Sequence, residues 1–255
     1  MILLASYLLF FCSCKKESEA DSSNVTKASS TDEILETDSP GISATTLGYT
    51  KFVLQPGDDG QDAWIDWYEG DPSYADGNSG SIDQFKCLAW TIGGVPVYSR
   101  TLIRFDGLSV IPDGSSVLYA KLFLFGLSSS PIHLPEGNSY YPGSPYNIYG
   151  PNGVNVQRII SPWDEGTVTW NTQPSSTTDD QSKIQASNAQ WNYNASADVT
   201  KMVRYFLANP SANYGFLLSL INETPYHSMG FCSSEYKNAG KDLSWLSFIN
   251  NFVII

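Results

Sequence analysis

The sequence has few of the residues that hold transition metals or act as general bases. Its 255 residues include only two histidines, His133 and His227, which lie far apart in the chain. This scarcity excludes a multi-histidine metal site, and no nucleophile-elbow motif is present to support a Ser-His-Asp triad. A polysaccharide lyase or a glycosidase stays open as an alternative, because the catalytic groups of these enzymes come together only in the fold.

Positive charge is also scarce. The chain has 14 Lys and Arg against 26 Asp and Glu, which gives a net charge of −12 and a pI near 4.4. Nucleic-acid binding needs a basic surface that neutralises phosphates, so this partner class is excluded. Cations or neutral polymers are more compatible partners.

Long stretches of helical periodicity are nearly absent. Short apolar runs are separated by turns rich in the 20 glycines and 14 prolines. This pattern predicts an all-β fold, a sandwich or barrel of antiparallel strands. Residues 199–207 are the exception and predict one short helix, which Asp198 caps and which ends before Pro210.

Residues 158–171, RIISPWDEGTVTWN, form the most distinctive segment. The pattern predicts a strand, a corner near Gly166 and a second strand over residues 167–170. Trp163 and Trp170 each bury a large aromatic surface, so the corner should be a packing hub. Asp164 and Glu165 are neighbours that point to opposite faces of an extended chain, which disfavours a role as an acid/base pair.

Two further segments carry specific predictions. Residues 117–127 predict the longest strand, with a core face made of Leu118, Ala120, Leu122 and Leu124. Residues 173–187 are polar and predict a mobile connection without regular structure.

The N-terminal residues predict export. An apolar run over residues 1–11 precedes Cys12-Ser13-Cys14, and Ser13-Cys14 resembles the lipobox of bacterial lipoproteins. The resemblance implies that Cys14 is diacylated and anchors the chain at the outer membrane or cell surface. A signal cut without lipidation would instead give a secreted or periplasmic protein. We therefore expect a lipoprotein signal peptide at 1–14, a flexible tether at 15–47 and the β-sandwich domain at 48–255.

Three aspartates near the start of the folded part raise the question of a cation. Asp58, Asp59 and Asp62 offer the carboxylate oxygens that calcium prefers, although the spacing is not that of an EF-hand loop. The two hypotheses are a structural calcium site and an Asp-Gly turn that needs no ion.

Cys87 and Cys232 lie in apolar strands downstream of the lipidation motif. An exported protein can join such a pair in a disulfide, but buried free thiols fit the same pattern. The sequence leaves both alternatives open.

Aromatic side chains gather in and beside irregular segments. The loop over residues 131–153 is too long for an ordinary hairpin and holds four tyrosines, while two tryptophans and a tyrosine precede the turn-rich loop at 69–80. Rigid aromatic rings of this kind can stack on sugars, or the loop can fold down as an extra lid over the core. The candidate carbohydrate contacts are Trp64, Trp67, Tyr68, Tyr140, Tyr141, Tyr146 and Tyr149.

Several segments together resemble one family. They are SRTLIRFDGL at 99–108, AKLFLF at 120–125, QRIISPWDEGTVTWNTQ at 157–173, ADVTKMV at 197–203, NYGFLL at 213–218 and FCSSEY at 231–236. In order and spacing they resemble the DNRLRE domain family, which is treated in part as carbohydrate-binding module family 96. The resemblance implies a jelly-roll β-sandwich and polysaccharide binding, but no catalytic or binding residues carry over from it.

The interpretation is a membrane-tethered, non-catalytic domain that binds a polysaccharide, neutral or acidic. The alternatives are a structural or adhesive surface protein that docks protein partners and, with less support, a polysaccharide lyase or hydrolase.

Overall fold

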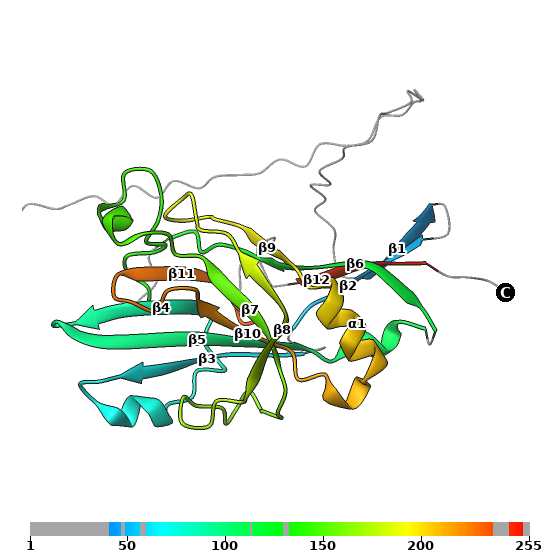
Figure 1. Cartoon of the computed structure of the whole chain (residues 1–255), viewed down its shortest axis with the longest axis horizontal. Coiled ribbons are helices and arrows are strands. Elements are labelled where there is room, and N and C mark those ends of the chain that lie inside the picture. The colour runs from blue at the N-terminus through cyan, green and yellow to red at the C-terminus, as the bar shows by residue number, and fades with distance from the viewer. Residues whose placement is uncertain are drawn as a thin grey trace, which may run out of the picture. The chain divides into compact units, whose positions relative to one another are not determined.

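The computed structural model describes residues 41–46, 49–56, 60–112, 114–129, 133–236 and 245–251. These residues belong to one compact unit, 39–255, built from two antiparallel sheets (Figure 1). The first sheet has the order β1-β2-β12-β6-β9, with the bounds Gly41–Thr46, Tyr49–Leu54, Trp245–Asn251, Ser116–Leu124 and Ala195–Asp198.

The second sheet has the order β11-β4-β5-β10-β7-β8, and β3 pairs with the opposite edge of β5, along residues 97–105. Its strands are β3 Gly60–Tyr68, β4 Gln84–Ile92, β5 Val95–Phe105, β7 Val154–Ile159, β8 Ser176–Ile184, β10 Phe216–Leu220 and β11 His227–Cys232. The chain crosses repeatedly between the sheets, for example from β5 to β6 and from β6 to β7. The predicted all-β sandwich of antiparallel strands with one short helix is confirmed.

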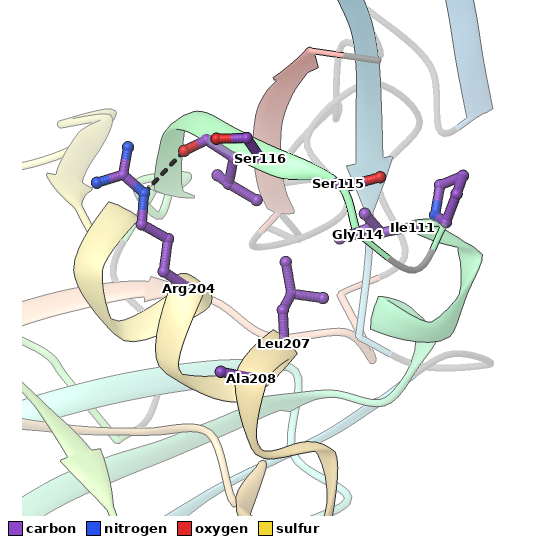
Figure 2. Close-up of a pocket in the computed structure, with 9 residues that line it drawn as sticks. Ile111, Gly114, Ser115, Ser116, Arg204, Leu207 and Ala208 are labelled. Atoms are coloured by element: carbon purple, nitrogen blue, oxygen red, sulfur yellow. Dashed lines mark hydrogen bonds between the residues drawn. The ribbon is translucent and has the colours of Figure 1, made fainter. Parts of the chain in front are cut away.

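The helix α1, Thr200–Ala208, follows β9 and lies beside β6. The helix begins one residue later than the sequence predicts, so Val199 and not Asp198 is its N-cap residue. The carboxylate of Asp198 still accepts a hydrogen bond from the N–H of Thr200. Arg204 on α1 donates to the carbonyl oxygens of Val117 and Leu118 at the start of β6 (Figure 2). None of the described helices is long and apolar enough to cross a membrane. Short 3-10 turns lie at Pro72–Asp76 (η1), Gly107–Val110 (η2), Pro145–Tyr149 (η3) and Pro210–Ala212 (η4).

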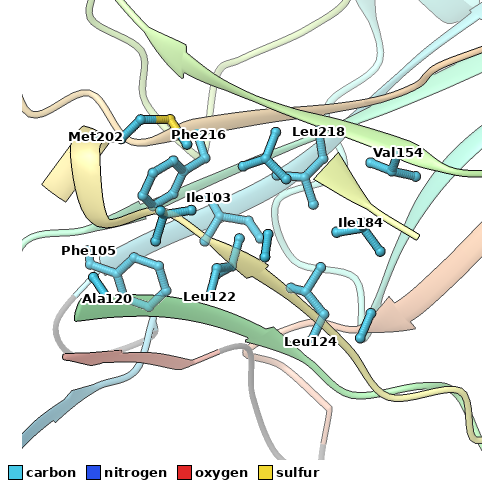
Figure 3. Close-up of a cluster of buried hydrophobic side chains, with 14 of the residues drawn as sticks. Ile103, Phe105, Ala120, Leu122, Leu124, Val154, Ile184, Met202, Phe216 and Leu218 are labelled. Carbon is cyan, nitrogen blue, oxygen red and sulfur yellow. The ribbon is translucent and has the colours of Figure 1, made fainter. Parts of the chain in front are cut away.

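The main core fills the space between the two sheets and α1 (Figure 3). Ile103 and Phe105 from β5 meet Leu122 and Leu124 from β6, and Phe206 on α1 packs edge-to-face on Phe216 of β10 at 5.6 Å. Burial of this much apolar surface is the dominant stabilising term in a domain of this size.

The predicted core face of β6 is wrong at one position. Leu118 is 44% exposed, whereas its neighbour Val117 is buried. The pairing with β12 explains this, because Ile249 faces Tyr119 but the next residue, Asn250, faces Val117. Leu118 is thus the extra residue of a β-bulge. The bulge shifts the alternation of side chains by one residue, so that Val117 and not Leu118 points into the core.

The predicted strand over residues 167–170 is wrong as well. Asp164 holds this stretch as a turn, because its side chain accepts from the N–H of Gly166 and its carbonyl oxygen accepts from the N–H groups of Thr167 and Val168. Such local hydrogen bonds compete with strand pairing. The packing-hub prediction holds, because Trp163 and Val168 bury their side chains against Ile65 and Leu217 in a second apolar cluster.

Two segments expected to lack regular structure form strands. Residues 176–184, within the predicted mobile connection, pair with β7 as strand β8. Gly41–Thr46, within the predicted tether, pairs with β2 as strand β1. Both are edge strands, and β8 buries only Ile184, so β8 has no apolar alternation for sequence analysis to detect.

Candidate functional site

The tyrosine-rich loop is held in one conformation by its own hydrogen bonds. Ser144 caps the turn η3 by accepting from the N–H of Tyr146, and the side-chain amide of Asn147 donates to the carbonyl oxygen of Tyr141 at 2.7 Å. The hydroxyl of Ser187, in the segment after β8, donates to the carbonyl oxygen of Tyr140 at 2.5 Å. The loop is therefore an ordered element that can position side chains.

Four aromatic rings meet where this loop contacts the second sheet. Trp90, at the end of β4, contacts Tyr146 edge-to-face at 4.6 Å and Tyr226 at 5.3 Å between ring centroids. Tyr226 also contacts Tyr149 at 4.6 Å. Tyr146 and Tyr149 are among the predicted sugar contacts, whereas Trp90 and Tyr226 escaped sequence analysis.

The backbone of Tyr226 has an unusual conformation. Its φ of +74° lies in the left-handed region, which costs a bulky residue about 1–3 kcal/mol. The conformation places the Tyr226 ring within reach of three other rings. Strain of this kind persists where the surrounding structure fixes it and is concentrated at functional sites.

The cluster continues across the sheet toward β3. Tyr68 on β3 and Trp90 on β4 both pair with Val97 on β5, so all three side chains lie on one face, and the backbones of β3 and β4 are about 10 Å apart there. Tyr74 then contacts Tyr68 edge-to-face at 5.5 Å. We call this set the aromatic strip, and its members are Tyr74, Tyr68, Trp90, Tyr226, Tyr146 and Tyr149.

The rings of the strip are partly available to a ligand. Tyr149 is 44% exposed and Tyr74 is similarly exposed, while the other four rings are half-buried. The charged groups beside the strip include carboxylates. Burial and then the neighbouring Glu136 carboxylate raise the pKa of Tyr146, and Glu69 and Asp71 follow Tyr68 in exposed positions.

The other predicted sugar contacts have different environments. Trp64 is only 1% exposed, with the ammonium group of Lys86 4.1 Å from its ring centroid, so a glycan cannot reach it. Trp67 stacks on Tyr98 at 5.6 Å, and Tyr140 and Tyr141 are half-buried at the base of the loop. These residues do not contribute to the strip.

Of the three predicted calcium ligands, Asp62 lies within the described residues, whereas Asp58 and Asp59 lie outside them. Asp62 is brought together with Glu165 and Glu235. The carboxylates that lie close to Glu165 are therefore those of Asp62 and Glu235, which the fold brings to it, and not that of its sequence neighbour Asp164.

The two described cysteines, Cys87 and Cys232, are both buried thiols. No disulfide joins them, so of the two alternatives the structure has the pair of buried thiols. Burial raises the pKa of the Cys87 thiol to about 12, so it stays protonated and unreactive at neutral pH. The predicted lipidation site, Cys14, lies outside the described residues.

A pocket of about 370 Å³ lies between α1 and the start of β6 (Figure 2). It is lined by small and aliphatic residues, including Ile111, Ser115 and Leu207, and by Arg204, whose guanidinium is engaged with backbone carbonyls. Its lining includes no aromatic ring, so it lacks the surface on which a sugar stacks.

The comparisons with known proteins agree with the resemblance of the sequence segments. No curated protein matches the chain. Residues 147–245, which run from within η3 to the first residue of β12 and include Tyr149 and Tyr226, match the model of carbohydrate-binding module family 96. Over these residues the chain is similar to a family of carbohydrate-binding domains, which agrees with the resemblance that the sequence segments indicate.

Proposed function

We propose that this chain is a non-catalytic polysaccharide-binding protein and that the aromatic strip is its binding surface. The observation that carries the proposal is the geometry of the strip. Six partly exposed rings, from two strands and three irregular segments, lie in contact with one another or on either side of one intervening residue, Val97. Rigid rings lose little conformational entropy when they bind a ligand, and a row of them suits a polymer better than a single sugar.

The charges beside the strip favour a neutral glycan. Glu136 lies against Tyr146, and the whole chain has a net charge of −12. A uronic-acid or sulfated polymer would bring further negative charge to this surface and be repelled, most strongly at low salt. Neutral glucans, xylans or mannans are therefore the proposed ligand class.

Affinity electrophoresis tests this proposal. The full chain is run in native gels that contain a neutral glucan, xylan, mannan, alginate or polygalacturonate, and its mobility is compared with that in a gel without polymer. We expect at least one neutral polymer to retard the chain and the acidic polymers to leave its mobility unchanged. Retardation only by acidic polymers would contradict the charge argument, and no retardation by any polymer would contradict glycan binding.

The absence of catalysis is part of the proposal. Asp62, the most perturbed carboxyl group described, is too buried to touch a glycosidic bond. The imidazole of His227 is buried too, with Nδ1 donating to the carbonyl oxygen of Thr224 at 2.8 Å. A candidate general acid or base must reach the proton it transfers, and neither group can.

We also propose that Cys14 is lipidated and that residues 15–40, the part of the expected tether before β1, tether the domain at the outer membrane or cell surface. The support is the sequence pattern around Ser13-Cys14. Mass spectrometry of the mature protein from its native host should find a diacylated Cys14 at the N-terminus, and Cys14→Ser should release the protein from the membrane fraction. A mature N-terminus elsewhere, or an unmodified Cys14, would show a secreted protein.

A further inference from the structure

Three carboxylates from distant parts of the chain converge at one point. Asp62 lies on β3, Glu165 in the corner after β7 and Glu235 just after β11. One oxygen atom from each lies within 4.8 Å of the others. Oxygen ligands of a single calcium ion lie about 2.3–2.6 Å from it, so any two of them are within about 5 Å of each other. The spacing therefore matches that of ligands around one ion.

Each carboxylate is oriented by at least one hydrogen bond. Oδ2 of Asp62 accepts from the N–H of Ser234 at 3.1 Å, and Oε1 of Glu165 accepts from the N–H of Asp62 at 3.1 Å. Oε1 of Glu235 accepts from the hydroxyl of Ser234 at 2.8 Å. One oxygen of each group is thus fixed by the protein, which orients the group and leaves its second oxygen for another partner.

The second oxygen of Glu235 is the clearest sign of a missing partner. Oε2 of Glu235 is buried from solvent and has no hydrogen-bond partner within the described residues. A buried carboxylate oxygen without a partner is costly, and native structures rarely contain one unless an ion or water satisfies it.

The electrostatics of the cluster also call for a cation. Burial, and next the charge of Glu235, raise the pKa of Asp62 to about 8, and burial raises the pKa of Glu165. The positive charge of Arg104 lowers the pKa of Glu165 in opposition to burial. The guanidinium of Arg104, however, donates two hydrogen bonds to Asp106, at 2.7 and 3.1 Å. Among the described residues, no ion pair of its own neutralises the negative charge of the cluster.

The surroundings give the cluster both a rigid frame and access to solvent. Asn78 donates to the carbonyl oxygen of Glu165 at 2.7 Å, and a Cβ added to Gly80 would lie 2.3 Å from that oxygen, so glycine permits the close approach. On the other side, Glu235 lines an open hollow together with Ser81, Ile82 and Asp83. An ion could enter from this hollow.

We propose that Asp62, Glu165 and Glu235 bind one calcium ion, which joins β3, the corner and the segment after β11. Hard oxygen ligands suit calcium or magnesium, but magnesium demands near-ideal octahedral geometry and retains its waters, whereas calcium accepts the irregular set that three separate segments provide. The site differs from the Asp58, Asp59 and Asp62 set that the sequence indicates, and it is independent of the proposed glycan surface.

Isothermal titration calorimetry of the full chain with calcium chloride, after removal of bound ions by a chelator, tests the site. We expect saturable binding of one calcium ion and a thermal unfolding midpoint that rises with calcium concentration. The variant Glu235→Gln keeps the size of the side chain but removes a charged ligand, and it should weaken calcium binding by about tenfold or more. The matched control is Asp179→Asn, an exposed carboxylate on β8, which should bind calcium like the parent.

Thermal unfolding in chelator separates ion binding from a purely structural role. Glu235→Gln removes one of several like charges, so without calcium it should unfold at the same temperature as the parent or higher, and it should lose most of the calcium-dependent rise. The proposal is overturned if the parent shows no saturable calcium binding, if Glu235→Gln binds calcium as tightly as the parent, or if Asp179→Asn loses binding equally.

Discussion

Replacing Trp163 by alanine is expected to lower the free energy of unfolding by about 3–5 kcal/mol. The side chain is 8% exposed and packs in the second apolar cluster with Ile159, Val168 and Leu217. Its indole N–H also donates to the carbonyl oxygen of Tyr214 at 2.8 Å, and alanine would leave that acceptor without its partner. Because most domains are stable by only about 5–15 kcal/mol, this single change could remove a large part of the total.

Urea denaturation of the full chain measures this effect, with Trp170→Ala as the matched control. Trp170 belongs to the same corner but is half-buried, with the Arg100 guanidinium 4.7 Å from its ring centroid. Its loss should cost about 1–2 kcal/mol, since less buried area and one cation–π contact disappear. Equal costs for the two variants would contradict the assignment of Trp163 as the packing centre of the corner.

The corner shows how far sequence patterns predict this fold. Two tryptophans in a short segment indicate a packing hub whatever the backbone does, and Trp163 is indeed buried. The alternation over residues 167–170 indicates a strand, but the hydrogen bonds that Asp164 accepts depend on the local turn and outweigh the alternation. Tertiary pairing decides β8 and the bulge at Leu118, and a single sequence carries no signal for either.

The candidate glycan site was predictable in part. Tyrosines in a long Pro- and Gly-rich loop are a recognisable signal, and this signal finds Tyr146 and Tyr149. Trp90 belongs to an otherwise buried strand, where an aromatic residue is normally core. Tyr226 reaches Trp90 because β11 pairs with β4, which places His227 opposite Ala89. The turn around Pro225 was the one local sign that Tyr226 lies outside a strand.

The carboxylate cluster was also predictable only in part. Asp62 stands out in an acidic turn, but its partners Glu165 and Glu235 follow it by 103 residues or more in sequence. The sequence around Glu165 gives no sign that its carboxylate meets Asp62. That contact exists only because the corner packs onto β3.

Replacing Trp90 by alanine is expected to weaken glycan binding by about tenfold to a hundredfold, which corresponds to about 1.4–2.8 kcal/mol. Trp90 contacts both Tyr146 and Tyr226 and lies between them and Tyr68, which pairs with the same residue of β5, Val97. Its removal takes away a stacking surface and also the support that orients the neighbouring rings. Trp90 packs against the buried Leu88 and Val97 cluster as well, so the variant's unfolding must be measured alongside its affinity.

Tyr149→Ala separates binding from stability. Tyr149 lies at the exposed end of the strip, so its loss should reduce affinity by a few-fold and leave the free energy of unfolding nearly unchanged. Tyr119→Ala is the matched control, because Tyr119 is an exposed tyrosine on β6 in the other sheet.

The most direct test of the central claim is a calorimetric titration of the parent chain, Trp90→Ala, Tyr149→Ala and Tyr119→Ala with the neutral polysaccharide that retards the parent most. The account predicts that affinity falls most for Trp90→Ala, less for Tyr149→Ala and not at all for Tyr119→Ala. Equal affinities for all four proteins would contradict the assignment of the aromatic strip as the glycan-binding surface.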